Sequence, residues 1–77
     1  MRKLQILGTG CPKCEQLAAN AQKALHQLGV PGEVIKVKDI KEIMQFGVMI
    51  TPGLVIDGEV KSSGKVLSPE EIRGLLQ

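Results

Sequence analysis

The sequence predicts a single α/β domain over residues 1–77, with a four-stranded mixed sheet and helices on both of its faces. Three observations predict this fold. Short β-branched runs alternate with stretches of helical period, which gives the order β-α-β-α-β-β-α. An Asp57-Gly58 pair stands between two short strand-like runs and is typical of a tight hairpin. The length of 77 residues leaves room for one small core only.

The first two elements are a strand and a long helix. The strand is expected over residues 3–7, where the run ends at Gly8-Thr9-Gly10. The helix follows over residues 15–28, because its apolar positions form one stripe. Those positions are 17, 18, 21, 24, 25 and 28. Pro12 suits its first turn, where a missing N–H is tolerated, and Gly29 ends it.

A second strand and a short helix come next. Val34, Ile35 and Val37 mark a strand over residues 33–38. Asp39 followed by Glu42 has the spacing of an acidic capping box and starts a helix that runs through Phe46. The two strand-to-helix steps predict parallel strand pairing, whereas the later hairpin adds antiparallel strands.

The last three elements are the hairpin and a terminal helix. Its strands are expected over residues 54–56 and 59–62, on either side of the Asp-Gly turn. Ser68 then provides an N-cap, Pro69 the first helical position and two glutamates the first turn. The sequence therefore predicts a capped helix near its C-terminus.

Composition and charge exclude several classes of protein. With 43% apolar and 23% charged residues, the chain has the make-up of a folded globular protein rather than of a disordered segment. No apolar run reaches the roughly 20 residues that cross a bilayer, and the first residues do not resemble a secretion signal. The net charge is only +2, the lysines are dispersed and Phe46 is the one aromatic residue, which argues against nucleic-acid binding. We expect a cytoplasmic protein.

The two cysteines form a Cys11-Pro12-Lys13-Cys14 motif with three possible interpretations. A disulfide between them would close too short a loop to staple the fold. The pair is a dithiol redox site, a soft-metal site that needs further ligands, or two incidental thiols. The spacing alone does not choose among them.

The position of the motif favours reactive thiols. Cys11 falls at the start of the first helix, where free N–H groups and the helix dipole stabilise a thiolate and lower its pKa. Lys13 adds a nearby positive charge, or is simply a solvated surface residue. Cys14 lies one turn further and is expected to be buried. This asymmetry predicts Cys11 as the nucleophile and Cys14 as the resolving thiol.

A second informative segment is Ile50-Thr51-Pro52-Gly53, directly before a strand. Proline is accepted at a strand entry, and an X–Pro bond is where a cis peptide can occur. From the residues alone an ordinary trans turn is the better expectation, because only about 5–6% of X–Pro bonds in folded proteins are cis.

Taken together, these motifs resemble the thioredoxin superfamily, and more narrowly the small, glutaredoxin-sized prokaryotic thioredoxin-like proteins known as redox-active disulfide proteins. The resemblance covers essentially the whole chain. It rests on three stretches, which are residues 8–14 with the two cysteines, residues 46–60 with the Thr-Pro pair and the hairpin, and residues 63–68 before the last helix. It implies a thioredoxin-like fold, in which Pro52 is a cis-proline facing the sulfurs, Thr51 offers its backbone to a substrate and Gly64 lets a partner chain approach.

The resemblance also implies an activity. The chain would be a thiol–disulfide oxidoreductase that reduces protein disulfides through Cys11 and Cys14, acting in electron transport and cell redox homeostasis. It would need no bound cofactor or metal besides its own redox-active disulfide. Its partners would be disulfide-containing proteins and, as electron donor, thioredoxin reductase or the glutathione system, and it would act as a monomer.

Two residues depart from the family pattern, and one alternative function remains. Gly10 replaces the usual tryptophan before the first cysteine, and Gln5 replaces the buried acid that serves the resolving thiol. Water or a neighbouring lysine would then assist Cys14. The alternative is a copper-type metallochaperone, which also carries Cys-x-x-Cys between a first strand and helix. Its later order of elements differs from the one predicted here.

Overall fold

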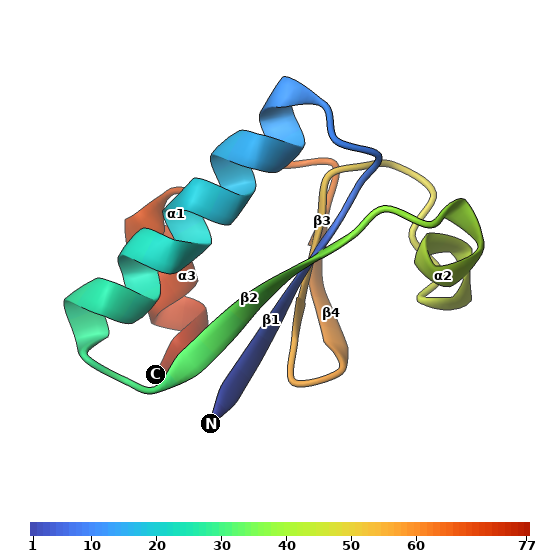
Figure 1. Ribbon diagram of the computed structural model, residues 1–77. Coiled ribbons are helices and arrows are strands. Elements are labelled where there is room, and N and C mark those ends of the chain that lie inside the picture. The colour runs from blue at the N-terminus through green and yellow to red at the C-terminus, as the bar shows by residue number, and fades with distance from the viewer.

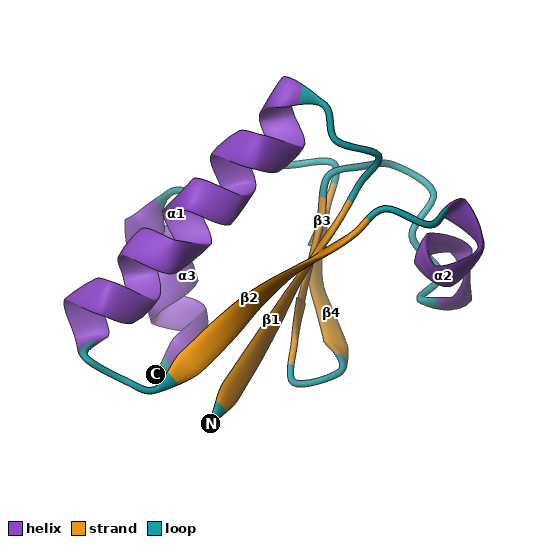
Figure 2. Cartoon of the chain, viewed as in Figure 1, coloured by secondary structure: helices purple, strands orange, loops and turns teal.

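The computed structural model describes residues 1–77 and confirms the predicted order of elements. Figures 1 and 2 show the strands as one twisted sheet, with α1 and α3 on one side of it and α2 on the other. The elements are β1 (Arg2–Leu7), α1 (Pro12–Leu28), β2 (Gly32–Val37), α2 (Ile40–Gln45), β3 (Gly53–Ile56), β4 (Glu59–Ser63) and α3 (Pro69–Leu76). The chain has the α/β architecture that its sequence predicts.

The sheet has four strands in the order β2-β1-β3-β4. β1 and β2 are parallel, in a register that runs from Arg2 opposite Gly32 to Leu7 opposite Val37. β3 is antiparallel to β1, and β4 is antiparallel to β3 with an irregularity between Leu54 and Val55. The sheet is therefore mixed, and β1 occupies an inner position next to the start of α1.

One expectation about strand direction is wrong. The step from β2 through α2 was expected to give another parallel pair, but β3 runs antiparallel to β1. The connection over residues 38–52 is long enough to return along the sheet. Instead, Ile43 of α2 packs in one buried cluster with Leu7 and Val37, which keeps the connection at one end of the sheet. The chain therefore enters β3 at Gly53, opposite Leu7, at the same end of the sheet where β2 finishes.

Local capping explains where the helices begin and end. α1 starts at Pro12, earlier than its apolar stripe suggests, and ends at Gly29 with a left-handed φ of 65°. Asp39 caps α2 by accepting a hydrogen bond from the backbone N–H of Lys41. Ser68 and Glu71 form a complete capping box at the start of α3. None of the helices combines the length and apolar character that a membrane crossing requires.

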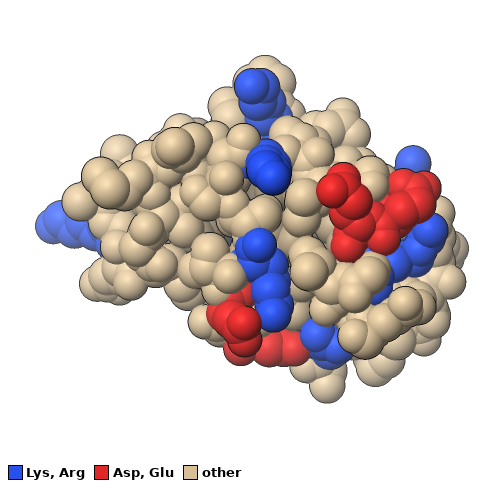
Figure 3. Space-filling model, turned by 180° about the vertical axis from the view of Figure 1, so that it is seen from behind, with Lys and Arg blue, Asp and Glu red and all other residues tan.

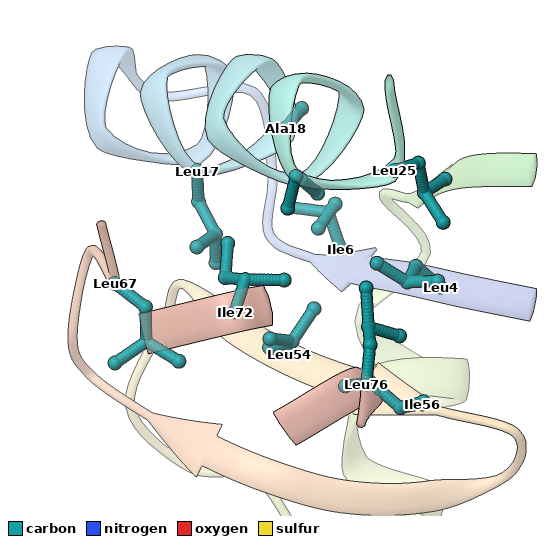
Figure 4. Close-up of a cluster of buried hydrophobic side chains, with 12 residues drawn as sticks. Leu4, Ile6, Leu17, Ala18, Leu25, Leu54, Ile56, Leu67, Ile72 and Leu76 are labelled. Carbon is teal, nitrogen blue, oxygen red and sulfur yellow. The ribbon is translucent and has the colours of Figure 1, made fainter. Parts of the chain in front are cut away.

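The core has two parts, one on each face of the sheet. The larger part holds 12 buried residues between the sheet, α1 and α3, including Leu17, Leu54 and Ile72 (Figure 4). Alanines on α1 let that helix approach the strands closely. The smaller part has five buried residues, among them Ile43 of α2. α2 is thus held by little buried surface and lies beside the loop that carries the cysteines.

Arg2 joins three parts of the chain at the end of the molecule far from the cysteines. Its Nε donates to Oδ2 of Asp57 in the hairpin turn at 2.7 Å, and its guanidinium also donates to the carbonyl of Leu76 at 2.8 Å. Figure 1 shows both chain termini at this lower end, whereas α1 begins at the top.

Candidate active site

The loop between β1 and α1 brings the two sulfurs into contact. Cys11 is the N-cap of α1, with extended backbone angles, and its carbonyl accepts hydrogen bonds from the N–H groups of Cys14 and Glu15. Cys14 follows in the first helical turn, which directs its side chain back toward Cys11. The Sγ atoms lie 2.8 Å apart, and either thiol can donate to the other. Both cysteines are free thiols.

The surroundings of the two thiols differ in the way that the sequence predicts. Cys11 is partly exposed, whereas Cys14 is 5% exposed and lies in the core. Burial raises the pKa of the Cys14 thiol, because a thiolate is poorly solvated there. The pKa of Cys11 is lowered, chiefly by the hydrogen bond from Cys14 and then by backbone N–H groups at the helix start. Of the two, Cys11 more readily forms the anion.

The sequence predicts that the N-terminus of the helix lowers the pKa of Cys11. The backbone N–H groups of Cys14 and Lys13 do stabilise the Cys11 sulfur, but the neighbouring thiol contributes more. A buried thiol that donates to an exposed one holds a single negative charge on the outer sulfur. This arrangement suits attack by Cys11 on an external disulfide followed by attack of Cys14 on the resulting bond.

Gly8 forms the wall behind the buried sulfur, whereas the sequence predicts only that it ends the first strand. A Cβ at this position would overlap with Sγ of Cys14 and would lie 3.8 Å from Cβ of Thr51. Gly8 is buried, and its N–H donates to the carbonyl of Val37 at 3.0 Å, which extends the β1–β2 pairing. The absent side chain at position 8 therefore leaves the space that Cys14 fills.

The Thr51-Pro52 segment lies near the same position, because Cβ of Thr51 is 3.8 Å from where a Cβ of Gly8 would stand. The Thr51–Pro52 peptide bond is cis, Pro52 is buried and Thr51 is exposed. The carbonyl of Pro52 accepts a hydrogen bond from the N–H of Gly64 at 2.8 Å, whereas the backbone groups of Thr51 have no backbone partner. The segment thus presents free hydrogen-bonding groups close to the dithiol.

Gly64 is fixed against this segment by two constraints. Its φ of 78° lies in the left-handed region, and a Cβ would approach Cγ2 of Ile50 to 2.8 Å. Ser63 Oγ also donates to the carbonyl of Ile50. The residues at positions 51, 52 and 64 therefore lie together, and Thr51 brings this group close to Gly8 and Cys14.

The polar residues near the dithiol include one that sequence reasoning missed. Lys38, directly after β2, places its amine about 4.0 Å from where a Cβ of Gly10 would stand. Lys13 is exposed and forms no ion pair. Gln5, which replaces the family's buried acid, is half-buried in β1 opposite Ile35 and Val55. Lys38 could be found only in three dimensions, because it is far from Cys11 in sequence.

A groove of about 250 Å³, called the apolar groove below, lies beside the dithiol loop. It is lined by Thr9, Ile40, Ile43, Met44, Val48, Met49 and Thr51. The groove connects the loop after β1, the short helix α2 and the segment before Pro52. Nowhere in the structure is a group of three or more His, Cys, Asp or Glu side chains placed to hold a metal ion.

Comparison with known proteins agrees with this geometry. Residues 2–77 match the family described as a thioredoxin domain. A thioredoxin of Methanothermobacter thermautotrophicus is 45% identical over 76 residues, which cover 99% of both chains. A thioredoxin of Methanocaldococcus jannaschii is 44% identical over 70 residues, 91% of this chain and 80% of that one. These relatives do not favour the alternative of a copper-binding protein.

Proposed function

The chain belongs to the thioredoxin family and is a thiol–disulfide oxidoreductase, and we propose that it reduces protein disulfides with Cys11 as the nucleophile and Cys14 as the resolving thiol. The observation that carries this assignment is that the pKa values of the two neighbouring thiols shift in opposite directions. The exposed sulfur has a lowered pKa, and the buried sulfur 2.8 Å away has a raised one.

The reaction takes place in two exchanges. The Cys11 thiolate attacks one sulfur of the partner's disulfide, the S–S bond breaks, and the other partner sulfur leaves as a thiolate that takes up a proton. Cys14 then gives its proton to solvent and attacks the Cys11 sulfur. This step forms the Cys11–Cys14 disulfide and releases the second partner thiolate. Two electrons have passed from the dithiol to the partner.

The surrounding residues have supporting roles in this proposal. The exposed backbone of Thr51, which has no backbone partner, receives an extended partner segment by hydrogen bonding. Pro52 holds Thr51 in its position beside the sulfurs. Gly64 keeps the adjacent surface low, while Pro12 and Lys13 shape the loop between the cysteines. With no buried carboxylate at the site, water takes the proton from Cys14.

Membership of the family supports a proposal for the wider setting of the protein. The protein acts as a monomer in a reducing cytoplasm on disulfide-containing proteins, with its Cys11–Cys14 disulfide as the only redox group and no bound cofactor. Thioredoxin reductase or the glutathione system returns the disulfide to the dithiol. Such a cycle uses a transient disulfide, as is usual in that compartment.

Insulin reduction with dithiothreitol present tests the proposal. The wild-type protein should accelerate precipitation of the reduced insulin chains, and Cys11→Ser should return the rate to that of dithiothreitol alone. Without dithiothreitol, the reduced Cys14→Ser variant should instead accumulate a mixed disulfide between Cys11 and the substrate, visible by mass spectrometry. Equal rates for the wild-type protein and Cys11→Ser would refute the assignment.

A further inference from the structure

The apolar groove and its neighbour Ile50 hold four of the chain's eight exposed large apolar side chains. Ile40, Met44 and Met49 are 60%, 64% and 91% exposed, and neighbouring Ile50 is 65% exposed. Exposed apolar patches of this kind mark interaction surfaces. Methionine is flexible and polarisable, so the two methionines can adapt to different apolar side chains.

The acidic residues of α2 do not reach this groove. At about 100° per residue, Ile40, Ile43 and Met44 share one face of the helix, and Glu42 lies on the opposite face. The carboxylate of Asp39 is already occupied as the N-cap. The groove therefore has no free carboxylate along the helix that forms its side.

The segments around the dithiol carry an excess of positive charge. Residues 8–15, 36–39, 48–52 and 63–66 hold four lysines but only two carboxylates. Of the carboxylates, Glu15 is paired with Lys36 at 2.6 Å and Asp39 is the cap just described. Of these four lysines, Lys13, Lys38 and Lys65 form no ion pair. On the face that Figure 3 shows, the top of the molecule, where α1 begins, has blue side chains and no visible red ones.

We propose that the partner of this dithiol presents its disulfide in an extended segment that has acidic residues next to the cysteine and an apolar side chain for the apolar groove. The inference rests on the proposed function, because it names the substrate class of the same site. Lys38 directly precedes the N-cap of α2, and its amine is about 4.0 Å from where a Cβ of Gly10 would stand, so it lies beside both the dithiol loop and the helix of the groove. Complementary charge at this point accelerates encounter and rejects basic partners.

Two probe peptides test the proposal. Each is a disulfide-linked peptide dimer with a leucine near its cysteine, and they differ only in having two glutamates or two lysines beside the cysteine. The rate constant of the reduced protein with each probe is divided by that of dithiothreitol, a neutral thiol, to remove differences in intrinsic reactivity. We expect the acidic probe to react about tenfold faster at low ionic strength, and the ratio to approach one in about 1 M salt.

Variants locate the effect. Lys38→Gln and Lys65→Gln should each reduce the acidic-to-basic ratio about threefold. Lys23→Gln, which makes the same change of charge at an exposed position further along α1, should keep the wild-type ratio. A third probe with glycine in place of the leucine tests the groove. Met49→Gln should reduce the difference in normalised rate constant between the leucine probe and this glycine probe.

The outcomes separate this inference from the function on which it rests. Equal normalised rates for the two probes, or a ratio that Lys38→Gln and Lys65→Gln leave unchanged, would overturn the charge selectivity while reduction of both probes upheld the function. A dimer in sedimentation that Met49→Gln dissociates would place a second copy of the chain in the groove and also overturn it. Failure to reduce either probe would instead count against the proposed function.

Discussion

Sγ of Cys14 fills the space that any side chain at position 8 would occupy, so Gly8 and Cys14 form one packing unit. Gly8 closes β1 through its hydrogen bond to Val37, and Cys14 belongs to the first turn of α1. The contact therefore fixes the distance between the sheet and the dithiol. Changes at Gly8 should affect both stability and thiol chemistry.

Gly8→Ala should destabilise the protein by about 1–3 kcal/mol, the usual range for overpacking a buried site. The new methyl group would push Cys14 outward and weaken its hydrogen bond to Cys11, so the pKa of Cys11 should rise. Chemical denaturation and a pH titration of the thiols measure the two effects. Gly74→Ala is a matched control, because nothing lies within 4 Å of its Cβ position and the glycine is in α3. It should stabilise the protein by about 0.5–1 kcal/mol.

Alkylation at pH 7 should modify Cys11 much faster than Cys14. The thiolate is the reactive form, and the lowered pKa of Cys11 gives it the larger thiolate fraction, whereas Cys14 is buried and its pKa is raised. Peptide mapping by mass spectrometry after a brief iodoacetamide treatment gives the order. Faster modification of Cys14 would reverse the assigned roles.

Removal of the neighbouring thiol should raise the pKa of Cys11, because the hydrogen bond from Cys14 is the largest cause of its lowering. Cys14→Ala should therefore shift the pH profile of Cys11 alkylation to higher pH. Cys14→Ser retains a donor and should shift it less. If the two variants behaved alike, the backbone N–H groups would be the main cause instead.

Asp57 should contribute to stability in a pH-dependent way. Its pKa is lowered, first by the hydrogen bond from the N–H of Lys3 and then by Arg2. This contribution is present above the ordinary Asp value of 3.8 and is lost as the pH falls through the lower pKa of the folded state. Asp57→Asn tolerates the positive φ of this turn and should show a shallower decline of Tm in acid. An equally steep decline in both proteins would contradict the assignment.

Asn20 is the buried polar side chain that ties α1 to the segment before α3. Its amide donates to the carbonyl of Leu67 at 2.9 Å. Asn20→Ala should leave that buried carbonyl without its partner and destabilise the protein by about 1–3 kcal/mol in denaturant unfolding. Gln16→Ala, which removes only the more exposed partner of Asn20, should have less than half this effect. If Asn20→Ala lost no more stability than Gln16→Ala is expected to lose, the carbonyl of Leu67 would have found another donor.

Local chemistry explains which parts of the fold the sequence could predict. Asp39, Ser68 and Gly29 act on backbone groups a few residues away, so the helix ends were readable from their immediate neighbours. The same holds for the hairpin at Asp57-Gly58, which the structure places between β3 and β4. The difference in exposure and thiol pKa between Cys11 and Cys14 was also predictable, because both residues lie within one turn at the start of α1.

The features that were missed depend on contacts between distant segments. The direction of β3 follows from the packing of Ile43 in one cluster with Leu7 and Val37, and no residue of β3 records it. Gly8 matters because Cys14 packs against it, and Lys38 matters because β2 ends beside the loop of Gly10. The hydrogen bond between the two sulfurs likewise depends on their distance of 2.8 Å, which the spacing of the cysteines in the sequence does not give.

The Arg2 junction gathers the two chain ends at the pole opposite to the thiols (Figure 1). An electrode, a bead or a fused carrier could therefore be attached through either terminus while the reactive sulfur still faced the surrounding liquid. Immobilised in this orientation, the molecule would remain open to large clients.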